Sequence, residues 1–469
     1  MKSQDELHKK RVLVLGFGRQ GKALARWLPK VGARVLVNDQ RSAEDMNLNR
    51  KDYPGVEFIL GRHPTAILRG LDLICVSGGV SLDMPLLEAA RERNIPLTND
   101  AQLFMERCPA PIIGITGSAG KTTTTTLVGE IVQRAGYKTW VGGNIGDVLL
   151  DVLDDIAVDD VVVMELSSFQ LELMTTSPQV AAILNITPNH LDRHKTMANY
   201  VTAKANIIAH QKPNDIAILC EDDPVTKSLE GMIRGELATF SARSMVPNGT
   251  FCVGNRLVVS GAASFDYVPH ILCEKHEIPL RGDHNVLNVL AACAIAGSLG
   301  LAAKRPGIEP EIMREVITQF LPVPHRLEVV REINGVTYVN DSIATAPERL
   351  LAALRSFDEP LILLLGGADK DLPWEDAVHL ALQKSRYVIL FGKSGKKQVG
   401  DKTLKLFQLM GATEQVVLRV PTLEEAVKRA AEISQKGDVV LLSPGGTSYD
   451  AYHDFAERGE HFRQLVEKL

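Results

Sequence analysis

The sequence predicts an α/β fold of three domains, each built on a mainly parallel β-sheet. Short apolar runs alternate with helix-like segments along most of the chain, which is typical of parallel strands covered by helices on both faces. Two of these runs lead directly into glycine-rich turns, at residues 16–21 and 117–120. Prolines separate the alternating blocks near residues 109–111 and 321–324. We therefore expect domains at 1–109, 110–322 and 323–469.

The length, composition and net charge limit which classes of protein the chain can belong to. The 469 residues suffice for about three domains of ordinary size. A hydrophobic content of 45%, a charged content of 23% and a net charge of −5 are those of a soluble globular protein. No basic cluster favours nucleic acid as a partner. We therefore expect small anionic ligands and no nucleic-acid partner.

Targeting and cysteine patterns point to the cytoplasm. We identify no apolar run that approaches the roughly 18 residues of a membrane span. The polar start, from Lys2 to Arg11, lacks the apolar core of a signal peptide. The six cysteines are scattered without a C-x-x-C pair, so neither disulfides nor a cysteine zinc site is expected. We expect a cytoplasmic protein without a membrane partner.

The first block carries a nucleotide-binding pattern. An apolar strand from Arg11 runs into Gly16-Phe-Gly18-Arg-Gln-Gly21, a helix follows, and a second strand ends at Asp39. This is the order of a Rossmann-like unit, with the acidic residue about 20 positions after the glycines. Taken alone the pattern would suggest NAD, but the same geometry serves any pyrophosphate or ribose. The turn at Gly78-Gly79, after the strand at 71–76, is either another ligand loop or a plain connection.

The second block opens on a phosphate cradle. The apolar run 111–116 leads into Gly117-Ser-Ala-Gly120-Lys121-Thr122, and a helix is predicted from Thr123 to Gly136. Glycines let backbone N–H groups approach phosphate oxygens, a lysine supplies positive charge and a threonine hydroxyl can bind Mg²⁺. The spacing departs from the common P-loop, because Ile115 occupies the position of its first glycine. The alternative is a glycine-rich connection with an incidental lysine.

Further candidate residues follow the cradle. Glu165 ends an apolar strand, where a Mg²⁺ ligand is expected in a nucleotide-hydrolysing fold. His190 and His194 are spaced i, i+4, but no third zinc ligand with the usual signature follows. Lys204 lies in a predicted helix at 200–210, where residue type alone favours a surface lysine. Asn285 and Asn288 share one face of a later helix.

The third block repeats the α/β alternation after Leu321-Pro-Val-Pro324. Near-continuous apolar strands are predicted at 336–341, 361–367, 387–391, 416–420 and 438–443. Helical stretches separate them, so a second Rossmann-like domain is expected.

Together these motifs resemble the Mur ligases of bacterial cell-wall synthesis over essentially the whole chain. The resemblance is carried by residues 117–123, 165–170, 185–193, 203–204, 284–285, 325–326, 340–345 and 442–450. The Asn-Asp-Ser-x-Ala-Thr run at 340–345 is similar to that of the glutamate-adding members. The resemblance implies a Rossmann-like domain that binds a UDP-sugar, a central P-loop-type ATPase domain and a Rossmann-like C-terminal domain. It implies ligation of glutamate to UDP-N-acetylmuramoyl-L-alanine through an acyl phosphate.

The resemblance also implies roles for individual residues. Catalytic roles fall to Lys121, Glu165, His190 and Lys204. ATP would contact Gly117, Ser118, Ala119, Gly120, Lys121, Thr122 and Thr123, together with Asn285, Arg326 and Asp341. Two Mg²⁺ ions would be held by Thr122, Glu165, His190 and Lys204, with Lys204 converted by CO₂ to a carbamate. The UDP part would lie at Gly18, Arg19, Gln20, Asp39, Arg41 and Gly79, the muramoyl part at Asn144 and His190, and glutamate at Thr345, Lys370, Ser448 and Phe455.

Two departures accompany this resemblance. The family usually has Asn at the position of Ala119, and its glutamate ligases commonly have Lys at the position of Ile343. A monomer is expected, with the boundary prolines Pro322 and Pro324 as a hinge that lets the C-terminal domain close. The alternatives are an NAD-dependent dehydrogenase, a P-loop NTPase that uses hydrolysis for conformational work, and a related ligase of the folylpolyglutamate synthase type or one that adds L-glutamate.

Overall fold

The computed structural model describes residues 5–145, 148–321, 324–395 and 397–469. These residues fall into two compact units. The N-terminal unit comprises Met1–Glu277 with Leu287–Gln319, and the C-terminal unit comprises Ile278–Val286 with Phe320–Leu469. The predicted hinge at Pro322 and Pro324 lies partly outside the described residues. The predicted domain limits at 109/110 and 322/323 stay predictions.

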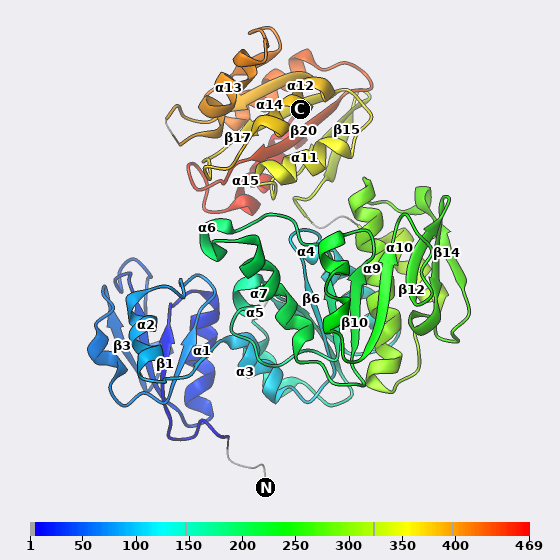
Figure 1. The fold of residues 1–469 in the computed structure, drawn as a ribbon. Coiled ribbons are helices and arrows are strands. Elements are labelled where there is room, and N and C mark those ends of the chain that lie inside the picture. The colour runs from blue at the N-terminus through cyan, green and yellow to red at the C-terminus, as the bar shows by residue number, and fades with distance from the viewer. Residues whose placement is uncertain (1–4, 146–147, 322–323, 396) are drawn as a thin grey trace. The chain divides into compact units, whose positions relative to one another are not determined.

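The first sheet of the N-terminal unit is parallel throughout, in the order β3-β2-β1-β4-β5 (Figure 1). Its strands and helices are β1 (Arg11–Leu15), α1 (Arg19–Lys30), β2 (Arg34–Asp39), β3 (Val56–Leu60), β4 (Leu73–Val76), α2 (Pro85–Glu92), β5 (Leu97–Thr98) and α3 (Asp100–Arg107). Short 3₁₀ turns lie at Arg50–Asp52 and Thr65–Leu68.

Alternate residues of β1 face opposite layers of helices. Val12 and Val14 belong to a core cluster with residues of α1 and α3, whereas Leu13 and Leu15 pack with residues of α2. Because side chains alternate along a strand, a continuous apolar run can bury both faces of a sheet. The burial of β1 on both faces explains why its sequence shows no polar alternation.

The second sheet of the same unit has the order β14-β13-β12-β11-β10-β9-β6-β8-β7. Its first part comprises β6 (Ile112–Thr116), α4 (Lys121–Arg134), β7 (Thr139–Gly143), a 3₁₀ turn at Leu149–Asp155, β8 (Val161–Glu165), α5 (Ser168–Leu171), β9 (Val180–Ile183), α6 (Leu191–His194) and α7 (Met197–Ala209). Its second part comprises β10 (Ile216–Cys220), α8 (Pro224–Lys227), β11 (Glu236–Ser241), β12 (Gly249–Val253), β13 (Arg256–Ser260), β14 (His270–Glu274), α9 (Asp283–Ala303) and α10 (Pro310–Gln319), with 3₁₀ turns at Glu230–Met232, Gly261–Ala263 and Lys275–Glu277. Residues 283–286, the start of α9, belong to the C-terminal unit. The neighbouring pairs from β7 to β12 are parallel.

The antiparallel edge of this sheet was not anticipated from the sequence. Strands β12 and β13 form a hairpin in which Val253 pairs with Arg256 across the two residues Gly254-Asn255, and β14 pairs antiparallel with β13. A Gly-Asn pair between two apolar runs is a recognised hairpin signal. The three strands extend the parallel core away from the cradle that follows β6.

Helix α9 corrects one sequence expectation. The expectation that no apolar run approaches the length of a membrane span is wrong, because Asp283–Ala303 is long and apolar enough to cross a bilayer. In the structure 78% of its most apolar window is buried. The Thr250 hydroxyl of β12 donates to the Leu290 carbonyl at 2.6 Å. Burial in a protein core accounts for the composition of this helix.

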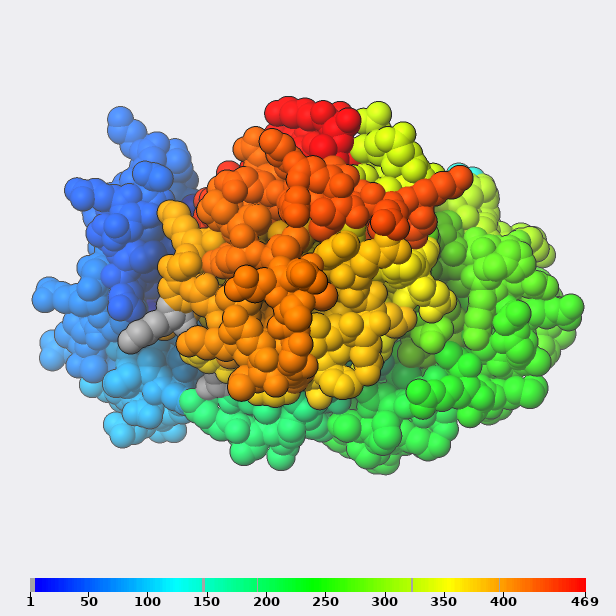
Figure 2. Space-filling view, turned by 90° about the horizontal axis from the view of Figure 1, so that it is seen from above, coloured from blue at the N-terminus to red at the C-terminus, as the bar shows by residue number. Residues whose placement is uncertain are grey.

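The C-terminal unit holds a sheet in the order β15-β16-β20-β17-β18-β19, parallel except for the β15/β16 pair. Its elements are β15 (Glu328–Ile333), β16 (Val336–Asn340), α11 (Pro347–Arg355), β17 (Leu361–Gly366), α12 (Glu375–Lys384), β18 (Ser385–Phe391), α13 (Val399–Leu409), β19 (Val417–Arg419), α14 (Leu423–Ile433), β20 (Val439–Gly445) and α15 (Phe455–Glu467). Leu361, Leu363 and Leu365 face α11 to α13, and Ile362 and Leu364 face α14 and α15. In the space-filling view the yellow-to-red surface of this unit faces the viewer (Figure 2).

Candidate functional site

A glycine-rich loop joins β6 to α4 at the carboxyl end of the second sheet. The helix begins at Lys121, and Gly120 precedes it with a φ of 84°. A Cβ on Gly120 would lie 2.1 Å from the Asn288 Oδ1, so a larger residue would have to displace the Asn288 side chain and would strain the backbone. The Lys121 ammonium donates to the Gly117 carbonyl at 2.6 Å and to the Ser118 carbonyl at 3.3 Å. The loop thus places a cation and a helix N-terminus together, which favours phosphate.

Hydrogen bonds to the segment after β9 and to α7 fix the loop. Asn185 accepts from the Ala119 amide at 2.9 Å and donates to the Ala119 carbonyl at 3.1 Å. The Ser118 hydroxyl donates to the Thr187 carbonyl at 2.9 Å and lies 3.0 Å from the Tyr200 hydroxyl. These hydrogen bonds hold the backbone of the loop in one conformation.

Glu165 lies beside the cradle at the end of β8 and is 2% exposed. One carboxylate oxygen accepts from the Thr122 hydroxyl at 2.9 Å, and the other accepts from the Asn144 side-chain amide at 2.9 Å. Hydroxyl and carboxylate oxygens are the ligands that Mg²⁺ prefers. The pair Thr122–Glu165 is therefore suited to a Mg²⁺ ion at the phosphate loop.

Lys204 lies on α7 and is only 1% exposed, so it is not a surface lysine. Its ammonium donates to the Gly117 carbonyl at 2.8 Å and to the Thr116 hydroxyl at 3.3 Å. Burial, and then the positive charge of Lys121, hold its pKa well below the ordinary value. The cradle therefore has a second lysine beneath it that favours the neutral amine.

His190 and His194 both contact Phe169 of α5. His190 is exposed and meets the ring edge-on at 5.0 Å between centroids, while the buried His194 stacks on it at 5.3 Å. The His194 Nε2 also lies 3.0 Å from the Ser168 hydroxyl. Among the described residues, no group of three or more His, Cys, Asp or Glu side chains is arranged as a metal site. The exposed His190 is thus the histidine of the pair that faces solvent.

The carboxyl edge of the first sheet holds the predicted UDP residues. Asp39 is the last residue of β2 and accepts from the Phe17 amide at 2.6 Å and from the Arg41 guanidinium at 2.8 Å. Burial alone would raise its pKa, but the hydrogen bonds from Arg41 and Phe17 lower the pKa of Asp39 to about 2. Gly21 approaches so closely that a Cβ there would lie 2.0 Å from the Gly16 carbonyl oxygen. The turn is built as the dinucleotide-binding pattern requires.

Other predicted UDP residues connect the first sheet to its surroundings. The Gln20 side chain accepts from the Gly78 amide at 3.2 Å, which ties α1 to the turn before Gly79. The Arg19 guanidinium donates to the carbonyl of Asn144 at 2.9 Å, beside the second sheet. Gly18 caps α1 and is exposed. Residues predicted for the UDP and muramoyl parts therefore lie together at Arg19 and Asn144.

The remaining nucleotide residues belong to the C-terminal unit. Asn285 donates to the Arg281 carbonyl at 2.8 Å, and Arg281 pairs with Glu359 at 2.7 Å. Asp341 accepts from the Ser443 hydroxyl at 2.8 Å, and burial raises its pKa to about 7 although Arg326 opposes this. Arg326 also contributes, after burial, to lowering the pKa of His284 to about 4. Asn285, Arg326 and Asp341 thus share one unit.

The predicted glutamate residues also lie in the C-terminal unit. The Lys370 ammonium is exposed and donates to the Thr345 hydroxyl at 3.3 Å. Ser448 is 2% exposed and follows β20, while Phe455 begins α15. The buried Arg458 donates to the Ser342 and Gly446 carbonyls, at 2.8 and 3.1 Å. Arg458 therefore joins the two connections that carry Thr345 and Ser448.

Comparison with known proteins places this architecture in a family. Residues 10–99 match the MurD-like N-terminal domain of Mur ligases, residues 115–296 the Mur ligase middle domain, and residues 325–446 the Mur ligase glutamate ligase domain. A UDP-N-acetylmuramoylalanine–D-glutamate ligase of Clostridium botulinum (strain Okra / Type B1) is 38% identical over 100% of this chain and 99% of its own length. The chain belongs to the Mur ligase family. A Clostridium kluyveri protein of the same name is 38% identical to this Mur ligase over 98% of the chain and 97% of its own length.

Solved structures show the same fold at low identity. The MurF ligase of Thermotoga maritima in complex with ADP superposes with a TM-score of 0.57 at 20% identity, covering 99% of this chain and 96% of its own. The UDP-N-acetylmuramate–alanine ligase MurC of the same organism gives a TM-score of 0.57 at 19% identity, covering 98% and 99%. The predicted three-domain α/β class and the resemblance to the Mur ligases are confirmed.

Several residues of this Mur ligase were not singled out by sequence reasoning. Asn185, Tyr200 and Phe169 support the cradle and the histidines, and Arg458 supports the glutamate residues. Arg193 donates to the carbonyls of Gly78 and Val80 at 2.6 and 2.5 Å and stacks on Phe169. Asn185, Phe169 and Arg193 lie within the motifs that carry the family resemblance, which was the available signal.

Proposed function

We propose that this Mur ligase adds D-glutamate to UDP-N-acetylmuramoyl-L-alanine with hydrolysis of ATP to ADP, a step in the synthesis of peptidoglycan precursors. The observation that carries the proposal is the 38% identity, over the whole chain, to curated relatives of that name. The match of residues 325–446 to a glutamate ligase domain supports it. L-Glutamate and the other family substrates are the alternatives that the experiment below separates.

The reaction needs an activated acid, because a carboxylate and an amine do not form an amide spontaneously in water. A carboxylate oxygen of the alanine attacks the γ-phosphorus of ATP, the bond to the bridging oxygen breaks, and ADP leaves. The glutamate amine then attacks the acyl carbon, inorganic phosphate leaves, and the new amide nitrogen loses a proton. Each step brings anions together, so positive charge must be supplied.

In our proposal the phosphate loop supplies part of that charge. Lys121 and the amides at the start of α4 hold the phosphates, while Thr122 and Glu165 hold one Mg²⁺ ion. His190 and Lys204 serve a second ion. Bound Mg²⁺ would neutralise phosphate charge during the transfer. Thr122 and Glu165 already lie within hydrogen-bond distance of each other at this loop, which supports their assignment to one ion.

We further propose that Lys204 is carbamylated. Its buried amine has a lowered pKa, and a neutral amine is the form that attacks CO₂, losing a proton as the N–C bond forms. The resulting carbamate presents oxygen atoms, which suit Mg²⁺, and its negative charge would be compensated by Lys121. The unmodified ammonium would instead repel the metal ion.

The remaining substrate groups are assigned to the other predicted residues. The UDP group would contact Gly18, Arg19, Gln20, Asp39, Arg41 and Gly79. Asn144 and His190 would contact the muramoyl part, and Asn285, Arg326 and Asp341 would bind ATP. Thr345, Lys370, Ser448 and Phe455 would bind glutamate, with Lys370 as the cation for a carboxylate. We propose that the enzyme acts as a cytoplasmic monomer, which analytical ultracentrifugation with and without substrates would check.

A substrate-dependence assay tests the function. Phosphate release is measured with ATP alone, with each substrate singly, and with UDP-N-acetylmuramoyl-L-alanine together with D- or L-glutamate. We expect release only with the nucleotide and D-glutamate together, and a product of the combined mass. Release with ATP alone would instead indicate a hydrolase, and equal rates with both enantiomers would refute the stereochemical assignment.

The carbamate is tested by removing CO₂. Enzyme in buffers purged of CO₂ should lose most of its turnover, and added bicarbonate should restore it. The variant Lys204→Ala, supplied with short-chain carboxylic acids, should recover part of the lost rate because a free carboxylate can replace the carbamate. Turnover that is unaffected by CO₂ depletion would reject the modification.

A further inference from the structure

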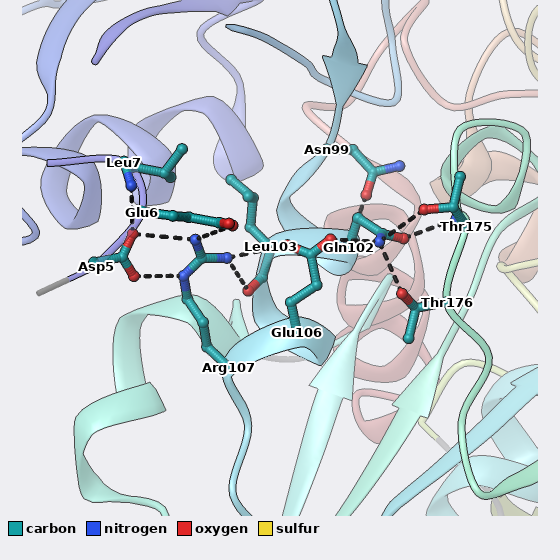
Figure 3. Close-up of polar contacts among 10 residues, drawn as sticks. All are labelled: Asp5, Glu6, Leu7, Asn99, Gln102, Leu103, Glu106, Arg107, Thr175 and Thr176. Atoms are coloured by element: carbon teal, nitrogen blue, oxygen red, sulfur yellow. Dashed lines mark hydrogen bonds and ion pairs between the residues drawn. The ribbon is translucent and has the colours of Figure 1, made fainter. Parts of the chain in front are cut away.

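A pocket lies in the N-terminal unit, lined by none of the residues assigned above. Its volume is about 390 Å³, within the range of small-molecule sites. It is lined by Glu6, Leu7, Lys10, Asp72, Leu73, Leu97, Thr98, Gln102, Leu103, Glu106, Leu173 and Thr175. Figure 3 shows part of its wall, with Gln102 and Glu106 on α3 and Thr175 on the segment after α5.

The pocket lies at the edge of the first sheet opposite the candidate UDP residues. Lys10 directly precedes β1, while Leu73 and Leu97 are the first residues of β4 and β5. Asp39, in contrast, is the last residue of β2, and Gly16 follows the end of β1. In a parallel sheet these are opposite edges, so the pocket is no extension of the predicted UDP site.

Hydrogen bonds connect the parts of the pocket wall to one another. The Gln102 side chain donates to Glu106 at 2.6 Å, to the Thr175 hydroxyl at 3.1 Å and to the Thr176 hydroxyl at 2.9 Å (Figure 3). It also accepts from the Thr175 amide at 2.9 Å. Both polar atoms of the Gln102 side chain, Nε2 and Oε1, therefore have hydrogen-bond partners. A wall held in this way retains its shape without a ligand.

The pocket lining combines apolar side chains with one buried hydroxyl that has no partner among the described residues. Five leucines line it: Leu7, Leu73, Leu97, Leu103 and Leu173. Thr98 also lines it, is only 6% exposed, and its buried hydroxyl oxygen has no hydrogen-bond partner among the described residues. A buried hydroxyl without a partner costs free energy. A ligand that bonds to Thr98 would remove that cost.

The charges around the pocket are mostly negative. Glu6, Asp72 and Glu106 line it, and Lys10 is the cation in the lining. Lys10 pairs with Asp72 at 3.4 Å, and the nearby Arg107 pairs with Asp5, Glu6 and Glu106 (Figure 3). Four carboxylates thus face two cations. The excess negative charge favours a cationic ligand and disfavours the anionic substrates of the ligase.

We propose that this pocket binds a small amphiphilic amine. Its ammonium group lies among Glu6, Asp72 and Glu106, its apolar body packs between the leucines, and a hydrogen-bonding group at its other end reaches the hydroxyl of Thr98.

Tyramine is the probe for this site, because it combines an ammonium group, an apolar ring and a hydroxyl. Binding to the full chain is measured by isothermal titration calorimetry, and we expect a single site with a Kd of about 0.1–1 mM. Phenethylamine, which lacks the hydroxyl, and 4-ethylphenol, which lacks the amine, should each bind at least about fivefold more weakly. 3-(4-Hydroxyphenyl)propanoate, which reverses the charge, should bind at least about tenfold more weakly. Equal binding of the amine and this acid would overturn the proposal.

Two variants locate the binding. Thr98→Val keeps the shape of the side chain and removes only the hydroxyl, and Glu106→Gln keeps an acceptor for Gln102. Thr98→Val should reduce tyramine affinity to that of phenethylamine, and Glu106→Gln should weaken tyramine but not 4-ethylphenol. Glu424→Gln, on the exposed surface of α14 in the other unit, is the matched control. Unchanged affinity in Thr98→Val and Glu106→Gln would refute the site.

Competition separates this site from the nucleotide sites. Tyramine binding should persist in saturating ATP and UDP, because the pocket lies at the opposite edge of the sheet. Displacement by either nucleotide would place the probe in the sites assigned to the ligase and would overturn the proposal. Ligase turnover in Thr98→Val and Glu106→Gln should match the unmodified enzyme, so this test does not depend on the proposed reaction.

Discussion

Burial determines what individual charged residues can do in this Mur ligase. Lys204 sits in a helix among alanines and isoleucines, where residue type alone favours a surface position, yet it is 1% exposed and lies under the phosphate loop. Its pKa is lowered, so it can react as a neutral amine. Only the resemblance to a family indicated this role, because no local pattern distinguishes a buried lysine from an exposed one.

A substitution of Lys370 would test the predicted glutamate site. Its exposed ammonium lies 3.3 Å from the Thr345 hydroxyl, and we propose that it binds a substrate carboxylate. Lys370→Ala should raise the KM for D-glutamate at least about tenfold, since a charged hydrogen bond contributes about 1.5–3 kcal/mol, and should leave the KM for ATP nearly unchanged. Lys428→Ala, an exposed lysine on α14, is the control. Equal changes in both KM values would show that Lys370 does not select glutamate.

The raised pKa of Asp341 predicts that the stability of the folded protein depends on pH. Burial raises its folded-state pKa to about 7, above the value near 3.8 of the unfolded chain. The folded state therefore binds more protons between these values, so stability is fully present below about pH 4 and declines as pH rises toward about 7. Thermal unfolding of Asp341→Asn from pH 5 to 8 should show a smaller decline than the parent by several degrees. Parallel pH profiles would contradict the raised pKa.

At the scale of elements, the phosphate loop depends on its anchoring as much as on its glycines. The sequence predicted the strand, the turn and the helix, although α4 begins at Lys121, two residues earlier than expected. It did not indicate that Asn185 bonds to Ala119 of the loop, or that Ser118 of the loop bonds to Thr187. Those contacts join residues more than 60 positions apart, and single-sequence patterns contain no information about such pairs.

Gly120 and Gly136 provide a matched comparison around α4. Both have positive φ, 84° and 92°, so alanine at either should cost about 1–2 kcal/mol of backbone strain. A Cβ at Gly120 would also meet Asn288, whereas nothing lies within 4 Å of a Cβ at Gly136. Gly120→Ala should therefore reduce ATP-dependent turnover by about 100-fold, since displaced catalytic groups have effects of that size, and Gly136→Ala should only lower the melting temperature. Similar turnover in the two variants would argue against a fitted loop.

At the scale of the molecule, the N-terminal unit joins two of the three predicted domains. Arg19 and Arg193 donate to backbone carbonyls across the junction of the two sheets, and Arg26 pairs with Asp151. The sequence predicted mainly parallel sheets and about half of their strands, because a continuous apolar run indicates a strand buried on both faces. It could not predict the contacts of Arg19 and Arg193, since their partners are backbone carbonyls, which every residue has.

The junction should respond to salt in two different ways. Carbonyl oxygens carry no net charge, so the bonds of Arg193 should be little affected by ionic strength, while the exposed pair Arg26–Asp151 should be screened. Arg193→Ala should lower the melting temperature similarly in 0.1 M and about 1 M KCl. Arg26→Ala should lower it at low salt only, by at most a few degrees. Equal salt sensitivity of both variants would contradict this distinction.

The apolar composition of helix α9 affects what happens when the protein is denatured by heat. Its most apolar window matches a lipid-crossing segment in composition and is tolerated in water only because 78% of it is covered. Heating that opens the second sheet would expose this apolar stretch to other protein molecules. Apolar surfaces of that length associate quickly. Thermal denaturation should therefore end in aggregates rather than in a refoldable chain, and the rate of inactivation, not an equilibrium, should set the working lifetime of the enzyme.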